Sequence, residues 1–198
     1  MPRIFFTADC HFNHTAILRM CQRPFATIEE HDQALVDNWN AVVGPGDQIF
    51  VIGDFAHKAD PEKVRKIFHK LRGAKHLILG NHDGEFVRTQ LPWSTVSERM
   101  KITVDAQKIV LDHYPMRSWQ GAHAGAIQLY GHVHNRLDVW PNSCDVGVDA
   151  WGYKPVTLPE IRARLDAAIP HELEETILAE PGEVTLDDEQ SADTGFKL

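Results

Sequence analysis

The chain has 198 residues, a formal net charge of -8 and three cysteines. This length is enough for one domain with a substantial core, and no apolar stretch reaches the roughly 18 residues that a membrane-spanning helix needs. The three cysteines are widely spaced, which indicates a reducing compartment, and the first residues lack a signal-peptide pattern. We therefore expect a cytoplasmic protein with no membrane partner.

The charge is unevenly distributed along the chain. Residues 171–198 contain nine acidic residues and one lysine and so carry the whole net charge, whereas residues 1–170 are neutral. We therefore divide the chain into a folded domain, 1–170, and an acidic C-terminal tail, 171–198. A neutral domain has no global basic field, so stable binding of long nucleic acids is not expected, although a local basic patch remains open.

Strands and helices alternate through the first half of the predicted domain. Short runs rich in Ile, Val, Leu and Phe predict buried strands at 4–6, 49–52 and 77–79. Between them, helices are predicted at 15–21, from an N-cap at Thr27 to about Val43, and at 61–71. Strand, helices, strand, helix and strand in this order indicate a parallel sheet.

The pattern changes after residue 100. Segments 101–104 and 108–111 predict a hairpin around Asp105-Ala106-Gln107. A further buried strand is expected at 127–130, and a last helix at 159–168.

Five of these apolar runs end in side chains that are common metal ligands. The blocks that follow them are Asp9-Cys10-His11, Gly53-Asp54, Gly80-Asn81-His82-Asp83, Asp112-His113 and Gly131-His132-Val133-His134. Ligands bind beyond the carboxyl ends of strands in open α/β sheets, so these blocks predict one polynuclear metal site, and hence an enzyme. A mixture of imidazole and carboxylate suits Mn, Fe or Zn better than Mg.

The five blocks, in this order, resemble those of the calcineurin-like metallophosphoesterase family, and the match runs from Asp9 to His134. The resemblance implies an α/β fold, a four-layer αββα sandwich of two mixed β-sheets flanked by helices, with two divalent transition metals. One metal would be held by Asp9, His11 and His134, the other by Asn81, His113 and His132, with Asp54 as the bridge. It also implies a metal-dependent phosphoesterase, a hydrolase in which metal-bound hydroxide attacks phosphorus.

Two further residues receive catalytic roles from the same resemblance. His82 would protonate the leaving oxygen or stabilise charge on the phosphoryl group, and Asp83 would orient it. A purely structural His82 remains the alternative.

Substrate-binding residues are less well defined. His14 follows His11 by three residues and could touch substrate, and Arg117 could bind phosphate. Surface or structural use is open for both. The other histidines, His57 among them, have no ligand context and are interpreted as ordinary, and Asp145 and Asp149 are expected to shape a turn.

We expect a small phosphodiester or phosphomonoester as the substrate. Protein Ser/Thr phosphatases of the family usually carry Asp-Arg-Gly at the second block and Glu after Asn-His, whereas this chain has Phe55-Ala56 and Asp83 there. Two alternatives remain: a nuclease of the same fold, and a catalytically silent interaction module. The presence of His82 and of every ligand position argues against the silent module. The oligomeric state is left open.

Overall fold

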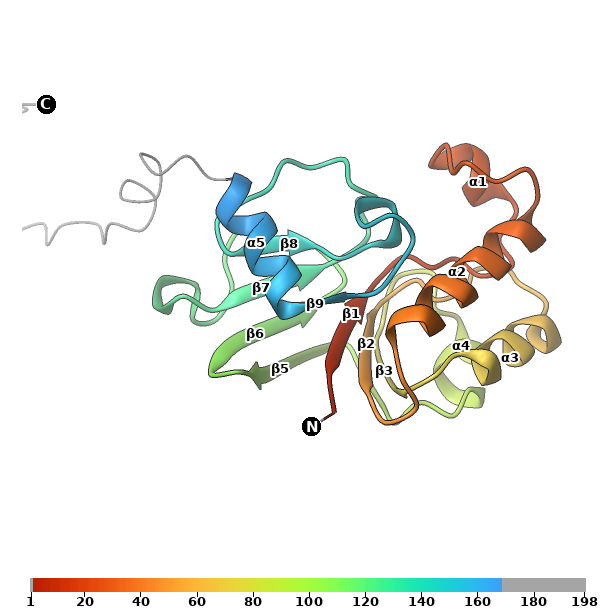
Figure 1. The fold of residues 1–198 in the computed structure, drawn as a ribbon, viewed down its shortest axis with the longest axis horizontal. Coiled ribbons are helices and arrows are strands. Elements are labelled where there is room, and N and C mark those ends of the chain that lie inside the picture. Colours follow the sequence, from red (N-terminus) through yellow and green to blue (C-terminus); the bar gives the residue numbers. More distant parts are fainter. Residues whose placement is uncertain (1, 169–198) are drawn as a thin grey trace, which may run out of the picture.

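The computed structural model describes residues 2–168, which form two β-sheets packed face to face with helices around them (Figure 1). The predicted acidic tail, 171–198, lies outside the described residues, as does the boundary drawn at residue 170. Within the described part of the chain, no helix is long and apolar enough to cross a membrane.

The first sheet has five strands in the order β4-β3-β2-β1-β9. They are β1 (Ile4–Thr7), β2 (Gln48–Ile52), β3 (Ala74–Ile78), β4 (Thr95–Ser97) and β9 (Val156–Thr157). Strands β1 to β4 are parallel, as the strand–helix order predicted, and β9 is antiparallel to β1. The sheet is therefore mixed.

The second sheet has four strands in the order β5-β6-β7-β8. They are β5 (Arg99–Val104), β6 (Gln107–Asp112), β7 (Ile127–Tyr130) and β8 (Ser143–Asp145). The predicted hairpin is β5 and β6, and both residues of its turn, Asp105 and Ala106, have positive φ. Strands β6, β7 and β8 are parallel, so this sheet is also mixed.

Five α-helices accompany the sheets within residues 2–168. They are α1 (Ala16–Met20), α2 (Ile28–Val42), α3 (Pro61–Lys70), α4 (Glu85–Gln90) and α5 (Leu158–Ala168). The predicted N-cap of α2 is confirmed, because the Thr27 hydroxyl accepts the N–H of Glu30 at 3.2 Å. The Glu30 carboxylate accepts the N–H of Ala26 at 3.0 Å, one residue before the N-cap, and not that of Thr27 as in a standard capping box. Helix α4 was not predicted from the sequence.

Alternate strand residues face two large cores. The outer face of the first sheet packs against α2, α3 and α4 through a cluster that includes Ile49, Trp39 and Phe68. The opposite faces of the two sheets meet in a second core, to which α5 contributes Ile161 and Leu165. The outer face of the second sheet has a thinner cover than the resemblance implied, formed by residues 116–126 with their 3₁₀ helix η1 (Ala122–Ala124).

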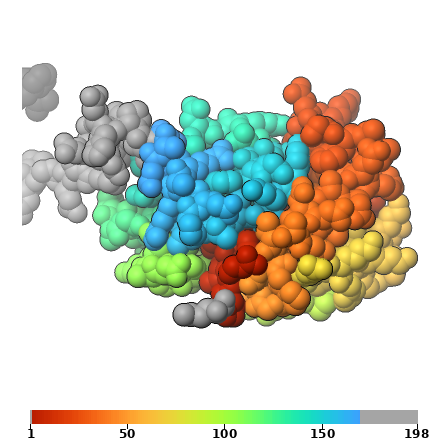
Figure 2. Space-filling model, viewed as in Figure 1, coloured from red at the N-terminus to blue at the C-terminus, as the bar shows by residue number. Residues whose placement is uncertain are grey.

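The two sheets are joined close to the ends of their parallel strands. Ala8, just after β1, forms a parallel bridge with Gly147, just after β8. In the space-filling view the first half of the chain, red to yellow, lies beside the second half, green to blue, and in contact with it (Figure 2). Loops from both sheets consequently meet at one edge of the molecule, where the predicted metal ligands lie.

Candidate metal centre

Left-handed backbone is concentrated at the predicted ligands. Residues with φ between 50° and 71° include Asp9, His11, Asp54, His132 and His134. Positive φ is uncommon outside glycine, and such strain persists only where the surrounding structure holds it. Backbone hydrogen bonds do so here: the N–H of Asp9 donates to Gly53 at 3.0 Å, and that of His11 to Asp54 at 2.9 Å. These turns bring the side chains of the predicted ligands towards one another.

The first predicted group of ligands is assembled in the structure. One ligand atom from each of Asp9, His11 and His134 lies within 4.8 Å of the other two. Asp9 and His11 are buried, with 0 % and 1 % of their surface exposed. Both carboxylate oxygens of Asp9 accept the backbone N–H of His132, at 3.0 and 2.9 Å, which fixes the carboxylate towards the centre.

Asp54 lies between the two predicted groups. Its Oδ2 is 3.5 Å from Nε2 of His11, in the first group, and 3.5 Å from Nε2 of His113, in the second. Its Oδ1 accepts the backbone N–H of His82 at 2.9 Å. One carboxylate oxygen is therefore equidistant from nitrogens of both groups, as a bridging ligand requires.

The second group is built around Asn81. Its amide oxygen lies 3.1 Å from Nε2 of His113 and 3.0 Å from Nδ1 of His132. His113 also belongs to a cluster with Asp9 and Asp54 whose ligand atoms lie within 4.8 Å of one another. All seven predicted ligands, which come from five strand ends, are thus brought together.

Two of the histidine rings are fixed by a hydrogen bond at Nδ1. Nδ1 of His113 lies 2.9 Å from the carbonyl oxygen of Ile52, which can only accept, so Nδ1 carries the proton. Nδ1 of His134 likewise donates to Asp149 at 2.7 Å. In both rings the second nitrogen is left for a ligand, an arrangement common in metal sites.

The protonation of these groups is shaped by burial. Burial raises the pKa of Asp9 to about 7 and lowers that of His11 to about 2. Burial would also raise the pKa of Asp54, but hydrogen bonding and charge from His113 bring it down to about 2. Within the described residues, Nε2 of His11 is buried without a hydrogen-bond partner.

These observations fit divalent cations. Buried carboxylates are costly unless they are paired or coordinate a metal, and an unpaired buried imidazole nitrogen is costly as well. Carboxylate, imidazole and amide oxygen donors together match transition metals. Glycine at Gly131 makes the packing possible, because a Cβ there would lie 2.6 Å from Cβ of Ala8 and 2.7 Å from Oδ2 of Asp9.

His82 lies at the edge of the centre, not among the ligands. Its ring is half-buried, and its centroid is 5.5 Å from that of His11 and 4.0 Å from that of His57. The ring is therefore close enough to act on a group bound at the centre. This position is compatible with the predicted catalytic role.

The contacts of Asp83 differ from those expected. Its carboxylate accepts three backbone N–H groups, from Asp54, Phe55 and Gly80, each at 2.9 Å. Both oxygens are occupied by these donors. Asp83 therefore fastens the loop after β2 to the loop after β3, and no hydrogen bond joins its carboxylate to the His82 ring in the described structure.

The two predicted substrate-binding residues have different positions. Nδ1 of His14 lies 3.4 Å from Nδ1 of His11, so this half-buried ring borders the centre. Burial lowers the pKa of His14 to about 4, which leaves it neutral at pH 7. Arg117 is exposed and lines a different cavity, with Leu137 and Trp140, whose walls include none of the metal ligands.

His57 was interpreted as ordinary, and the structure corrects this. Its ring centroid lies 4.0 Å from that of His82 and 4.9 Å from that of His14, so His57 borders the candidate metal centre. The sequence spacing could have indicated this position, because His57 follows the predicted ligand Asp54 by three residues, as His14 follows His11.

Arg23 and Asp149 were also missed. The Arg23 side chain is fully buried, and it donates from Nε and Nη2 to the Asp149 carboxylate at 2.9 and 2.7 Å and to the carbonyl of Asp9 at 2.7 Å. Asp149 in turn holds His134. Arg23 lies 126 positions from Asp149 in the chain, so no local pattern could reveal the pair.

Several known proteins are similar to this chain in sequence or in fold. The protein MJ1445 of Methanocaldococcus jannaschii, which is uncharacterized, is 35% identical over 168 residues, 80% of this chain and 88% of that protein. The Gene 66 protein of Mycobacterium phage L5 is 27% identical over 186 residues, 77% and 89% of the two chains. The protein of unknown function AQ665 from Aquifex aeolicus has the same fold, with a TM-score of 0.69 at 22% identity over 83% of this chain and all of that one.

The family is given by a match to a family model. Residues 2–150 match the model of the calcineurin-like phosphoesterase family. The matched residues contain all five blocks and every strand of the two sheets except β9. The chain belongs to the calcineurin-like phosphoesterase family and is a metal-dependent phosphoesterase.

Proposed function

We propose that the chain hydrolyses a small phosphodiester or phosphomonoester with two divalent transition metals at this centre. The observation that carries the proposal is the position of Oδ2 of Asp54, 3.5 Å from Nε2 of both His11 and His113. A carboxylate in this position can bridge two cations about 3.5–4 Å apart, the separation typical of two-metal phosphatases.

Each proposed metal has its own set of ligands. Asp9, His11 and His134 would hold one, Asn81, His113 and His132 the other, and Asp54 both. The donor set favours Mn, Fe or Zn. When bound, the two cations would supply positive charge that orients the phosphate and stabilises the charge developing on its oxygens.

The proposed role of the protein side chains is to place and protonate the leaving group. His82 lies beside the predicted ligands, and among residues 2–168 no carboxylate is bonded to its ring, so the ring is available to donate a proton to the leaving oxygen. The His57 ring lies 4.0 Å from that of His82, and the His14 ring lies next to those of His57 and His11.

Metal removal tests the proposal. Chelated protein should lose activity on a panel of mono- and diesters, and Mn²⁺ should restore it with two ions bound per chain. Full turnover in protein shown by elemental analysis to be metal-free would contradict the proposal. Inclusion of a short oligonucleotide tests the nuclease alternative, which predicts cleavage with a steep dependence on salt.

A further inference from the structure

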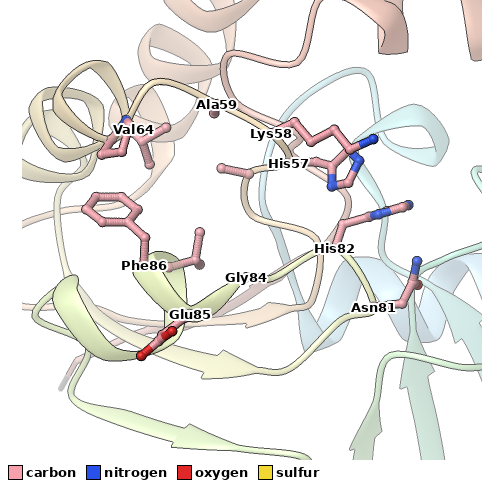
Figure 3. A pocket seen from close by; sticks show the side chains of 12 residues that line it. His57, Lys58, Ala59, Val64, Asn81, His82, Gly84, Glu85 and Phe86 are labelled. Carbon is pink, nitrogen blue, oxygen red and sulfur yellow. The ribbon is translucent and has the colours of Figure 1, made fainter.

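A cavity of about 410 Å³ opens beside His82, and its lining includes Asn81 but none of the other six predicted metal ligands (Figure 3). Asn81 and His82 belong both to the centre and to the wall of this cavity. The remaining lining residues come from the loop after β2, from α3 and from the start of α4. The volume lies within the range of small-molecule sites, roughly 300–1,000 Å³.

The two walls of the cavity differ in chemistry. Figure 3 shows Val64 and Phe86 on one side, and His57 and His82 on the other. The guanidinium of Arg65 lies 5.2 Å from the centre of the Phe86 ring and is ion-paired with Glu62, so the aromatic wall is supported from α3. An apolar wall that faces a few polar groups is typical of ligand sites.

The position of His82 indicates which part of a substrate enters the cavity. Its ring lies between the ligands and the cavity, and it is the proposed proton donor to the leaving oxygen. The group attached to that oxygen must therefore extend past His82, away from the phosphate. Beyond His82 the space is bounded by His57 and Phe86.

We propose that this cavity binds the leaving alcohol and selects esters in which that alcohol carries an aromatic ring. The inference rests on the proposed function. The lining offers the Phe86 ring on one wall and imidazoles on the other, and such groups interact favourably with the face and edge of an aromatic ring. In the reaction a water oxygen bonds to phosphorus and the bond from phosphorus to the leaving oxygen breaks. The leaving oxygen takes the proton of His82, and a proton from the water restores it.

Non-hydrolysable analogues test the inference directly. Benzylphosphonate and methylphosphonate share the phosphonate group, and a carbon takes the place of the leaving oxygen in both, so they differ only in the ring. Calorimetry on the metal-loaded protein should show benzylphosphonate binding at least about tenfold more tightly, as burial of one aromatic ring predicts.

Two variants remove the preference in opposite ways. Phe86→Ala deletes the aromatic wall, and Gly84→Leu fills the cavity: Gly84 has φ of -67°, and a Cβ there meets nothing within 4 Å. In both variants the ratio of the affinity for benzylphosphonate to that for methylphosphonate should fall towards one. Leu137→Ala, which trims an exposed side chain outside this cavity, should keep the wild-type ratio. Melting temperature and metal content show whether each variant is folded and loaded.

Equal affinities in the wild type, or an unchanged ratio in both cavity variants, would overturn the inference. Hydrolysis rates distinguish a failure of this inference from a failure of the proposed function. Turnover of aryl and methyl esters with equal kcat/KM would refute the cavity's role and leave the phosphoesterase standing. A binding preference with no hydrolysis of any ester would refute the hydrolase, and the leaving-group role with it.

Discussion

Asp54 presents its two oxygens to different partners: Oδ1 to the N–H of His82, and Oδ2 to the rings of His11 and His113. Asp54→Asn removes the negative charge between the two groups but keeps the shape of the side chain. Metal content should fall below two ions per chain and activity should be lost with it, as measured by elemental analysis and turnover. Asp37→Asn, an exposed carboxylate on α2, is the matched control and should retain both.

His82 is the residue for which chemistry and metal binding should separate. His82→Ala should retain both metals and lose turnover by roughly 10²–10⁴-fold, as expected for a lost general acid. The loss should shrink for nitrophenyl esters, because nitrophenolate leaves without a proton. Rates for a series of leaving groups measure this. Equal losses across the series would point to charge stabilisation or positioning by His82 instead.

At the residue scale, the sequence predicted what lies on strand ends and missed what depends on distant contacts. All seven predicted ligands follow short apolar runs, so the motif order was sufficient to single them out as candidates. Asp149 was assigned only a turn, because its bonds to Arg23 and His134 exist only in the folded chain. The hydrogen bonds of Asp83 to backbone N–H groups could not be predicted from the sequence either, for the same reason.

At the scale of elements, local signals decided which segments could be predicted. Helices α2 and α3 begin at residues whose side chains cap backbone N–H groups, Thr27 and Asp60, and both are long enough to show a helical pattern. Strands β4, β8 and β9 have only two or three residues each, too few for any period. Their place is decided by pairing with neighbouring strands.

The cap of α2 gives a stability prediction with an internal control. Thr27→Ala removes the acceptor of the Glu30 N–H and should lower the free energy of unfolding by about 1 kcal/mol. Thr15 occupies the same position in α1 but makes no capping hydrogen bond through its side chain, so Thr15→Ala should have little effect. Urea denaturation of both variants measures the difference. Equal losses would show that the Thr27 hydrogen bond contributes nothing specific.

At the scale of the whole molecule, the metal centre lies where the two sheets meet. Strands β1, β2 and β3 of the first sheet and β6 and β7 of the second each end at ligand residues. The strand–helix order of the first half was readable from the sequence, because each strand is a distinct apolar run. The packing of one sheet on the other was not, since it depends on side chains far apart in the chain, and only the family resemblance implied it.

Because the ligands come from both sheets, bound metal should stabilise the whole fold. A ligand that binds only the folded state, at a hundred times its Kd, adds about 2.7 kcal/mol, which for a domain of this size raises the melting temperature by roughly 5–10 °C. We expect such a rise when Mn²⁺ is added to chelated protein, followed by calorimetry. Asp54→Asn should show a smaller rise and Asp37→Asn the full one. An identical melting temperature with and without metal, at concentrations that fill the site, would mean that the unfolded chain binds metal as tightly as the folded protein does, and would contradict the prediction.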